Sequence, residues 1–95
     1  MDSFSTTEFM ATDVGRATTL AIERHADEII GTADLGLAPL TVLIPDLEAL
    51  VGERLQWKMV DSMIRDWLAP SFEATERVRV PTDLPHKALC YRRIT

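Results

Sequence analysis

The chain has 95 residues, of which 46% are hydrophobic and 26% charged, and its formal net charge is −5. This length and composition predict one globular domain, residues 1–95, whose core needs neither a metal nor a disulfide. The apolar runs are too short to cross a bilayer, and a single cysteine cannot form an internal disulfide, so we expect a cytoplasmic protein without a membrane span.

Charge is distributed unevenly along the chain. Residues 1–50 contain two basic and nine acidic side chains, whereas residues 51–95 contain eight basic and six acidic ones. From Arg77 onward there are five basic residues and one acidic residue. This asymmetry predicts an acidic face and a basic carboxy-terminal end, although uneven charge is also common in small domains without such a role.

The first expected element is a long helix from about Asp13 to Ile30. Residues 1–11 before it are expected to be flexible or to form a short extra helical turn. Thr12 or Asp13 can cap the helix, and Gly31 occupies the position of a left-handed C-cap residue. One face has the helical spacing of buried positions: Val14, Thr18, Ala21, Ile22, His25 and Ile29.

A loop, a strand and a second helix are expected next. Glycine and proline punctuate a loop over Thr32–Pro39. The apolar and β-branched run Leu40–Leu43 predicts a stub of strand. Pro45 suits the first turn of a helix, where its missing N–H is harmless, and Gly52 ends that helix.

A third helix is expected from about Arg54 to Leu68, where Pro70 stops it. Trp57 lies off its apolar stripe, so this side chain either packs under a neighbouring loop or anchors a protein interface. The buried face is predicted to consist of Val60, Met63, Ile64, Trp67 and Leu68.

The last quarter of the chain changes to an alternating pattern. Ala74–Val80 alternates, and Lys87–Ile94 is rich in strand formers although its alternation is ambiguous. Pro81–His86 between them is turn-like. The alternation places Arg77 and Arg79 on one strand face. These features predict a carboxy-terminal β-hairpin.

This order of helix, strand stub, helix, tight turn, helix and hairpin resembles the winged helix-turn-helix superfamily over about residues 12–94. Ile44–Leu68 is similar to a helix-turn-helix pair broken at Gly52. The resemblance implies an α+β, mainly helical fold in which three helices carry a hairpin wing. It also implies that the third helix enters the DNA major groove and that the wing lies on the sugar-phosphate backbone.

The resemblance implies a DNA-binding surface built from the third helix and the hairpin. Arg and Gln side chains reach base edges, and Lys meets phosphates. Asp61 and Asp66, expected to be exposed, oppose this role unless they are paired, and Arg65 has the i, i+4 spacing to pair with Asp61. A solvated salt-bridge surface and edge-strand charges that block aggregation explain the same residues without DNA. The expected DNA-binding residues are Arg54, Gln56, Lys58, Ser62, Arg65, Arg77, Arg79, His86, Lys87, Arg92 and Arg93.

No catalytic constellation is apparent, so we do not expect an enzyme. His25 lies on an apolar helix face and is interpreted as a satisfied core histidine. Cys90 and His86 form a conceivable thiol–imidazole pair, but no third residue is in view to orient them. Two histidines and one cysteine do not supply a metal site, and there is no glycine-rich phosphate loop, so we expect no metal or cofactor.

Three functions are compatible with these features. The first is a small, homodimeric DNA-binding transcription regulator whose dimer contact involves the first helix or the segment with Phe4, Phe9 and Met10. The second is an acidic protein-binding adaptor, or a phage- or plasmid-encoded inhibitor of host machinery, on the same fold. The third is a structural subunit of a larger assembly. We favour the first because it uses both the element order and the basic carboxy-terminal end.

Overall fold

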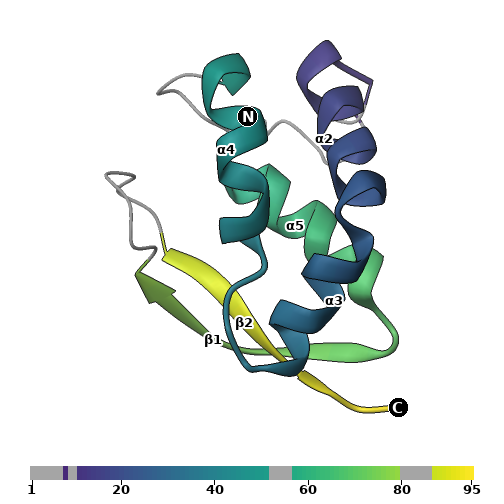
Figure 1. Cartoon of the computed structure of the whole chain (residues 1–95), viewed down its shortest axis with the longest axis vertical. Helices are drawn as coiled ribbons and strands as arrows, with labels where there is room; N and C mark the ends of the chain where they lie inside the picture. The colour runs from purple at the N-terminus through teal and green to yellow at the C-terminus, as the bar shows by residue number, and fades with distance from the viewer. Residues whose placement is uncertain (1–7, 9–10, 52–56, 80–86) are drawn as a thin grey trace.

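The computed structural model describes residue 8 and residues 11–51, 57–79 and 87–95, with only the backbone for residues 48–51 and 57. Four helices are followed by a two-stranded antiparallel hairpin (Figure 1). The expected α+β, mainly helical architecture is confirmed, with four helices in these ranges where three were predicted. The expectation for residues 1–11 lies almost wholly outside the described residues. The elements are α2 (Asp13–Arg24), α3 (Ala26–Asp34), α4 (Leu40–Val51), α5 (Trp57–Leu68), β1 (Phe72–Arg79) and β2 (Lys87–Arg93).

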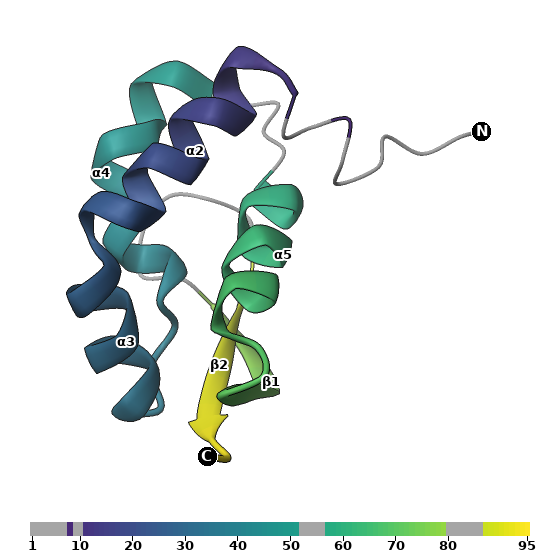
Figure 2. The same ribbon diagram turned by 90° about the vertical axis from the view of Figure 1, so that its right-hand side faces the viewer.

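The helix predicted over 13–30 is two helices that meet at His25. Thr12 caps α2, because its Oγ1 accepts a hydrogen bond of 3.0 Å from the Gly15 N–H. At His25 the backbone leaves the helical region, with φ −108° and ψ 26°, and α3 continues in a different direction (Figure 2). The apolar spacing hid this break because Ile22 and Ile29, on either side of it, are buried in the same core.

The glycine that ends this helical region is Gly36, whereas Gly31 lies inside α3. Gly36 has φ +78°, a left-handed conformation that favours glycine. Its N–H donates to the Ala33 carbonyl at 3.0 Å, and the Leu37 N–H donates to the Thr32 carbonyl at 3.1 Å. This is the Schellman pattern, so the helix extends into the segment that was predicted as loop.

The predicted strand stub over Leu40–Leu43 is instead the start of α4. A short apolar run is equally compatible with a buried strand and a buried helix. Pro45, expected in the first helical turn, lies inside α4 on an exposed side. The expected end of the helix at Gly52 lies outside the described residues. The buried residues of α4 follow helical spacing: Leu40, Leu43, Ile44 and Leu47.

Most of the core face predicted for α5 is confirmed, but Trp67 is not part of it. Trp67 remains 38% exposed and lines an open groove between α2 and α5. The side chain of Trp57 and the residues before it lie outside what the structure describes. The α5 residues that are buried as predicted are Val60, Met63, Ile64 and Leu68.

The predicted hairpin is confirmed, although its tip at Pro81–His86 lies outside the described residues. The strands pair in antiparallel register, with an irregularity between Ala74 and Glu76. β2 contacts both α3 and α5. Four consecutive β2 residues are buried, so the simple alternation of exposed and buried residues is lost. The buried β2 residues are Ala88, Leu89, Cys90 and Tyr91.

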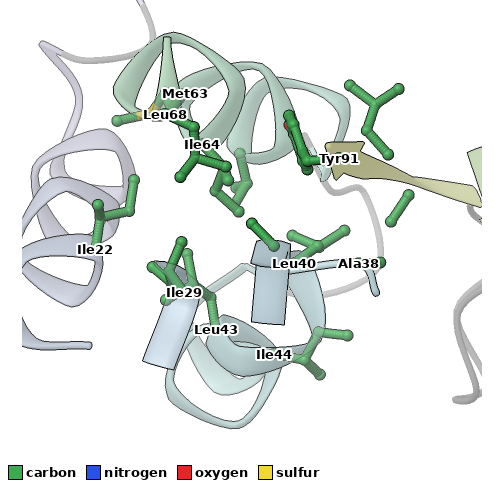
Figure 3. Packing of buried hydrophobic residues seen from close by; sticks show 14 of the residues in the cluster. Ile22, Ile29, Ala38, Leu40, Leu43, Ile44, Met63, Ile64, Leu68 and Tyr91 are labelled. Atoms are coloured by element: carbon green, nitrogen blue, oxygen red, sulfur yellow. The ribbon is translucent and has the colours of Figure 1, made fainter. Parts of the chain in front are cut away.

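One hydrophobic core joins the helices to the hairpin. In Figure 3, Ile29 of α3 and Leu43 of α4 lie across the core from Ile64 of α5, and Tyr91 of β2 lies at its side. All of these side chains are buried, and burial of each large apolar side chain contributes about 1.5–3 kcal/mol. This packing fixes α5 beside the hairpin. None of the described helices is long and apolar enough to cross a membrane.

Candidate functional site

A polar hollow of about 440 Å³ lies between α5 and the hairpin, and we call it the α5–hairpin hollow. Residues spaced three, four and seven apart share one face of a helix, which is why several α5 side chains reach it together. On the hairpin, Arg77 lies opposite Leu89 and Arg79 lies opposite Lys87 in the antiparallel register, so these residues share one face of the hairpin. The hollow is lined by Lys58, Asp61, Ser62 and Arg65 of α5, Arg77 of β1, and Lys87 and Leu89 of β2.

Positive charge gathers at this hollow although the whole chain is acidic. Lys58, Arg77 and Lys87 are exposed, and in the described ranges none of them forms an ion pair. Arg65 lies 3.6 Å from the Asp66 carboxylate, but both side chains are more than half exposed, so water screens that pair. Arg79, exposed and opposite Lys87, extends the surface along the hairpin. Five cations from α5, β1 and β2 therefore lie on or beside one concave surface.

Asp61 was predicted to be exposed, and this prediction is wrong. Arg65, whose spacing would allow it to pair with Asp61, lies beside Asp66 instead. Asp61 is only 2% exposed. Its Oδ2 accepts a hydrogen bond of 3.1 Å from the Leu89 N–H, while its Oδ1 has no partner in the described part of the chain. Burial raises the pKa of this carboxyl to about 6, and the Leu89 N–H, Arg77 and Arg65 oppose the rise.

The burial of Asp61 has a signal in the sequence that was overlooked. Asp61, Ile64 and Leu68 have the i, i+3, i+7 spacing of one helix face, and the last two were already assigned to the core. The position therefore belonged to the buried stripe. An aspartate is usually exposed, but the helical spacing of this one indicates burial.

Arg92 and Arg93, both expected to bind DNA, do not line the hollow and are paired with acids. Arg92 forms an ion pair with Glu73 on β1. Arg93 donates two hydrogen bonds, of 2.7 and 2.9 Å, to the Asp34 carboxylate on α3. This pairing lowers the pKa of Asp34 and raises that of Arg93. The two arginines thus cross-link elements of the fold.

The remaining expected site residues divide into two groups. Ser62 is half-buried and lines the hollow beside Lys58 and Arg65, so its hydroxyl is available there as a donor or acceptor. Arg54, Gln56 and His86 lie outside the described residues, and the structure places none of them.

His25 and Cys90, considered from the sequence as possible catalytic residues, lie outside this hollow. His25, expected to be a satisfied core histidine, has a side chain that is 23% exposed, and its ring nitrogens lie 2.7 Å from a Glu28 carboxylate oxygen and 2.9 Å from an Asp46 one. These two hydrogen bonds raise its pKa. Burial, with Glu76 and Asp61 nearby, raises the pKa of the Cys90 thiol, which disfavours the nucleophilic thiolate. Its suggested pairing with His86 lies outside the described residues.

A second, apolar groove of about 240 Å³ lies between α2 and α5. Ile22, Met63 and Trp67 form its apolar walls, and Glu23 and Asp66 carry carboxylates at it. Its chemistry suits an apolar side chain flanked by a basic one, and so differs from that of the α5–hairpin hollow.

No cluster of three or more potential metal-ligating side chains exists among the residues that the structure describes. Comparison with protein-family models, with curated proteins and with solved structures found no match.

Proposed function

We propose that this protein binds duplex DNA through α5 and the hairpin, as a small transcription regulator. The observation that carries the proposal is the convergence of Lys58, Arg65, Arg77 and Lys87 on one hollow in a chain of net charge −5. Each lysine or arginine that contacts a DNA phosphate releases condensed counterions, which favours binding. Because the rest of the protein is acidic, phosphate contacts are expected at this cationic surface.

The proposed geometry is that of a winged helix-turn-helix protein. Helices followed by a C-terminal antiparallel hairpin are consistent with that superfamily. In this proposal α5 lies in the major groove, with Ser62 and Arg65 toward base edges and Lys58 toward a phosphate. Arg77, Arg79 and Lys87 of the hairpin contact the adjacent backbone.

We further propose that the protein acts as a homodimer on DNA. One short helix and one hairpin offer few contacts, and two copies on a palindromic site would multiply them. Leu20 on α2, the helix suggested for the dimer contact, is 60% exposed. Light scattering across a range of concentrations tests this part, and a monomer at every concentration would remove it.

The test of DNA binding is fluorescence polarisation with a random duplex at low salt. We expect the Lys58→Ala/Arg77→Ala/Lys87→Ala variant to bind about 10- to 100-fold more weakly than the unmodified protein, because three phosphate contacts are lost. Arg16→Ala/Arg24→Ala/Arg92→Ala is the matched control: it removes the same net charge from residues that do not line the hollow. Equal losses in both variants, or no binding below about 100 μM, the weak limit of non-specific affinity, would overturn the proposal.

A protein-binding adaptor, or an inhibitor of host machinery, is the second candidate, and the groove between α2 and α5 favours it. The apolar walls and the two carboxylates at this groove suit a basic partner with an apolar anchor. A pull-down from native lysate with the unmodified protein and with Glu23→Gln/Asp66→Asn distinguishes the candidates. A stoichiometric basic protein that is lost with the variant supports the adaptor, and recovery of DNA alone removes it.

A further inference from the structure

The α5–hairpin hollow combines a cationic rim with a carboxyl on its floor. Four basic side chains line it, yet the group buried among them is Asp61, which is 2% exposed. An ionised carboxylate repels any anion that the rim attracts, and it carries no proton to donate to an anion. The hollow is therefore suited to binding an anion only when the Asp61 carboxyl is protonated and neutral.

Charged and titratable groups on α5, β1 and β2 surround Asp61. Arg65 and Arg77 favour its ionised form, and the Leu89 N–H does so as well. The negative charge of Asp61 raises the pKa of both Cys90 and Tyr91. The buried Tyr91 hydroxyl has no hydrogen-bond partner in the described ranges. The charged and titratable groups near it are Lys58, Arg65 and Asp66 on α5, Arg77 on β1, and Lys87, Cys90 and Tyr91 on β2.

We infer that the α5–hairpin hollow binds a phosphate group together with one proton, and that this proton is held by Asp61. Oδ2 already accepts the Leu89 N–H, so the proton is placed on Oδ1, the oxygen without a partner in the described residues. The proton comes from solvent and returns to it when the phosphate leaves. The four surrounding cations oppose a metal ion at this position, which leaves an anion as the ligand.

Linkage gives the direction of the effect. With the hollow empty, burial places the pKa of Asp61 at about 6, so the carboxyl is mostly ionised at neutral pH. A bound phosphate adds negative charge beside it and raises this pKa further. Phosphate affinity therefore increases as the pH falls from neutral toward 6, and binding takes up a proton.

The phosphate has two possible sources, the DNA backbone or a free phosphate compound. The first source rests on the proposed function, and the second does not. A duplex oligonucleotide represents the first, and sulfate represents the second. Neither the phosphodiester nor sulfate changes its own charge between pH 5.5 and 7.5, so any proton exchanged comes from the protein.

The experiment measures affinity for both probes at pH 5.5 and 7.5, at fixed ionic strength, for the His86→Gln protein with and without Asp61→Asn. His86→Gln removes the histidine next to Lys87 in the sequence, because histidine as a residue type can change its charge between pH 5 and 8. We expect at least one probe to bind about 10-fold more tightly at pH 5.5 when Asp61 is present. With Asp61→Asn, affinity at pH 7.5 should rise to that level and no longer depend on pH. Asp27→Asn, an exposed aspartate on α3, is the control for the change in charge.

Calorimetry of the His86→Gln protein in two buffers with different ionisation enthalpies counts the protons directly. Uptake approaching one proton per bound probe at pH 7 supports the inference. Duplex binding with the same pH dependence in both proteins overturns the inference and leaves DNA binding intact. Proton-linked sulfate binding without duplex binding overturns the DNA proposal and keeps the phosphate site. Binding of neither probe overturns both.

Discussion

The guanidinium of Arg93 in β2 holds the carboxylate of Asp34 at the end of α3 through two hydrogen bonds, across 59 residues of sequence. The same guanidinium lies 4.6 Å from the ring centroid of Phe72, so it packs on an aromatic face as well. Arg93 thus connects β2 to α3, and Phe72 of β1 lies at this connection. The α5–hairpin hollow is formed by other residues.

This arrangement predicts that two arginines of the hairpin have separable roles. Arg93→Ala should lower the melting temperature, because it removes the bidentate ion pair and the contact with Phe72, and should leave duplex affinity unchanged. Arg77→Ala should weaken duplex binding and leave the melting temperature within about 2 °C, as is usual for an exposed residue. Thermal unfolding and polarisation on both variants check this. A loss of affinity with Arg93→Ala that matches the loss with Arg77→Ala would contradict the assignment.

The two glycines around the end of α3 predict opposite effects of one substitution. Gly31→Ala should stabilise the protein by about 0.5–1 kcal/mol, because the residue is helical and a methyl group would meet no atom within 4 Å. Gly36→Ala should destabilise it by about 1 kcal/mol, because φ is +78° there. Urea unfolding of both variants gives the signs. Stabilisation by both substitutions would refute the assignment of Gly36 as the C-cap glycine.

Sequence patterns predicted some elements of this fold and missed others. The amphipathic face of α5 was recognised because it has one clear period. The hairpin was recognised because two segments rich in strand formers flank a turn-like segment. The break at His25 and the helical nature of Leu40–Leu43 were missed, because apolar spacing reports burial without reporting a change of helix direction or the type of a fully buried element. These features are set by tertiary packing against the shared core.

The candidate site was predicted in part for the same reason. Lys58, Ser62, Arg65, Arg77 and Lys87 were expected on two separate elements, and the structure brings them to one hollow. Periodicity within an element identifies which residues share a face. It does not say that β2 would pack beside α5, nor that Arg93 would reach Asp34 on α3.

The buried Asp61 predicts a stability that depends on pH. Folding raises its pKa from 3.8 to about 6, so the folded state binds the proton more tightly and stability falls as the pH rises from about 4 to 6. Asp61→Asn should remove that dependence and increase the free energy of unfolding at pH 7 by about 2–3 kcal/mol, since each pKa unit corresponds to about 1.4 kcal/mol. Urea unfolding at pH 5 and pH 7.5 measures it, with Asp27→Asn as the control. Parallel pH profiles for Asp61→Asn and the unmodified protein would contradict this account.

His25 predicts a second dependence at higher pH. Its pKa is raised by the Glu28 hydrogen bond and then by the Asp46 one, so its contribution to stability is complete below pH 6.5 and is lost as the pH rises through the raised value. His25→Gln should flatten the stability profile in that window. His86→Gln is the control for the other histidine. A profile that His86→Gln flattens and His25→Gln leaves unchanged would show that His25 is not the responsible group.

The most direct test of phosphate binding by the α5–hairpin hollow is the salt dependence of duplex affinity. Each phosphate contact contributes about −0.9 to the slope of log K against log salt concentration. The slope for the unmodified protein should therefore be steeper by about 2 to 3 than that for Lys58→Ala/Arg77→Ala/Lys87→Ala. The Arg16→Ala/Arg24→Ala/Arg92→Ala control should keep the steeper slope. Equal slopes in the unmodified protein and the hollow variant would contradict the account.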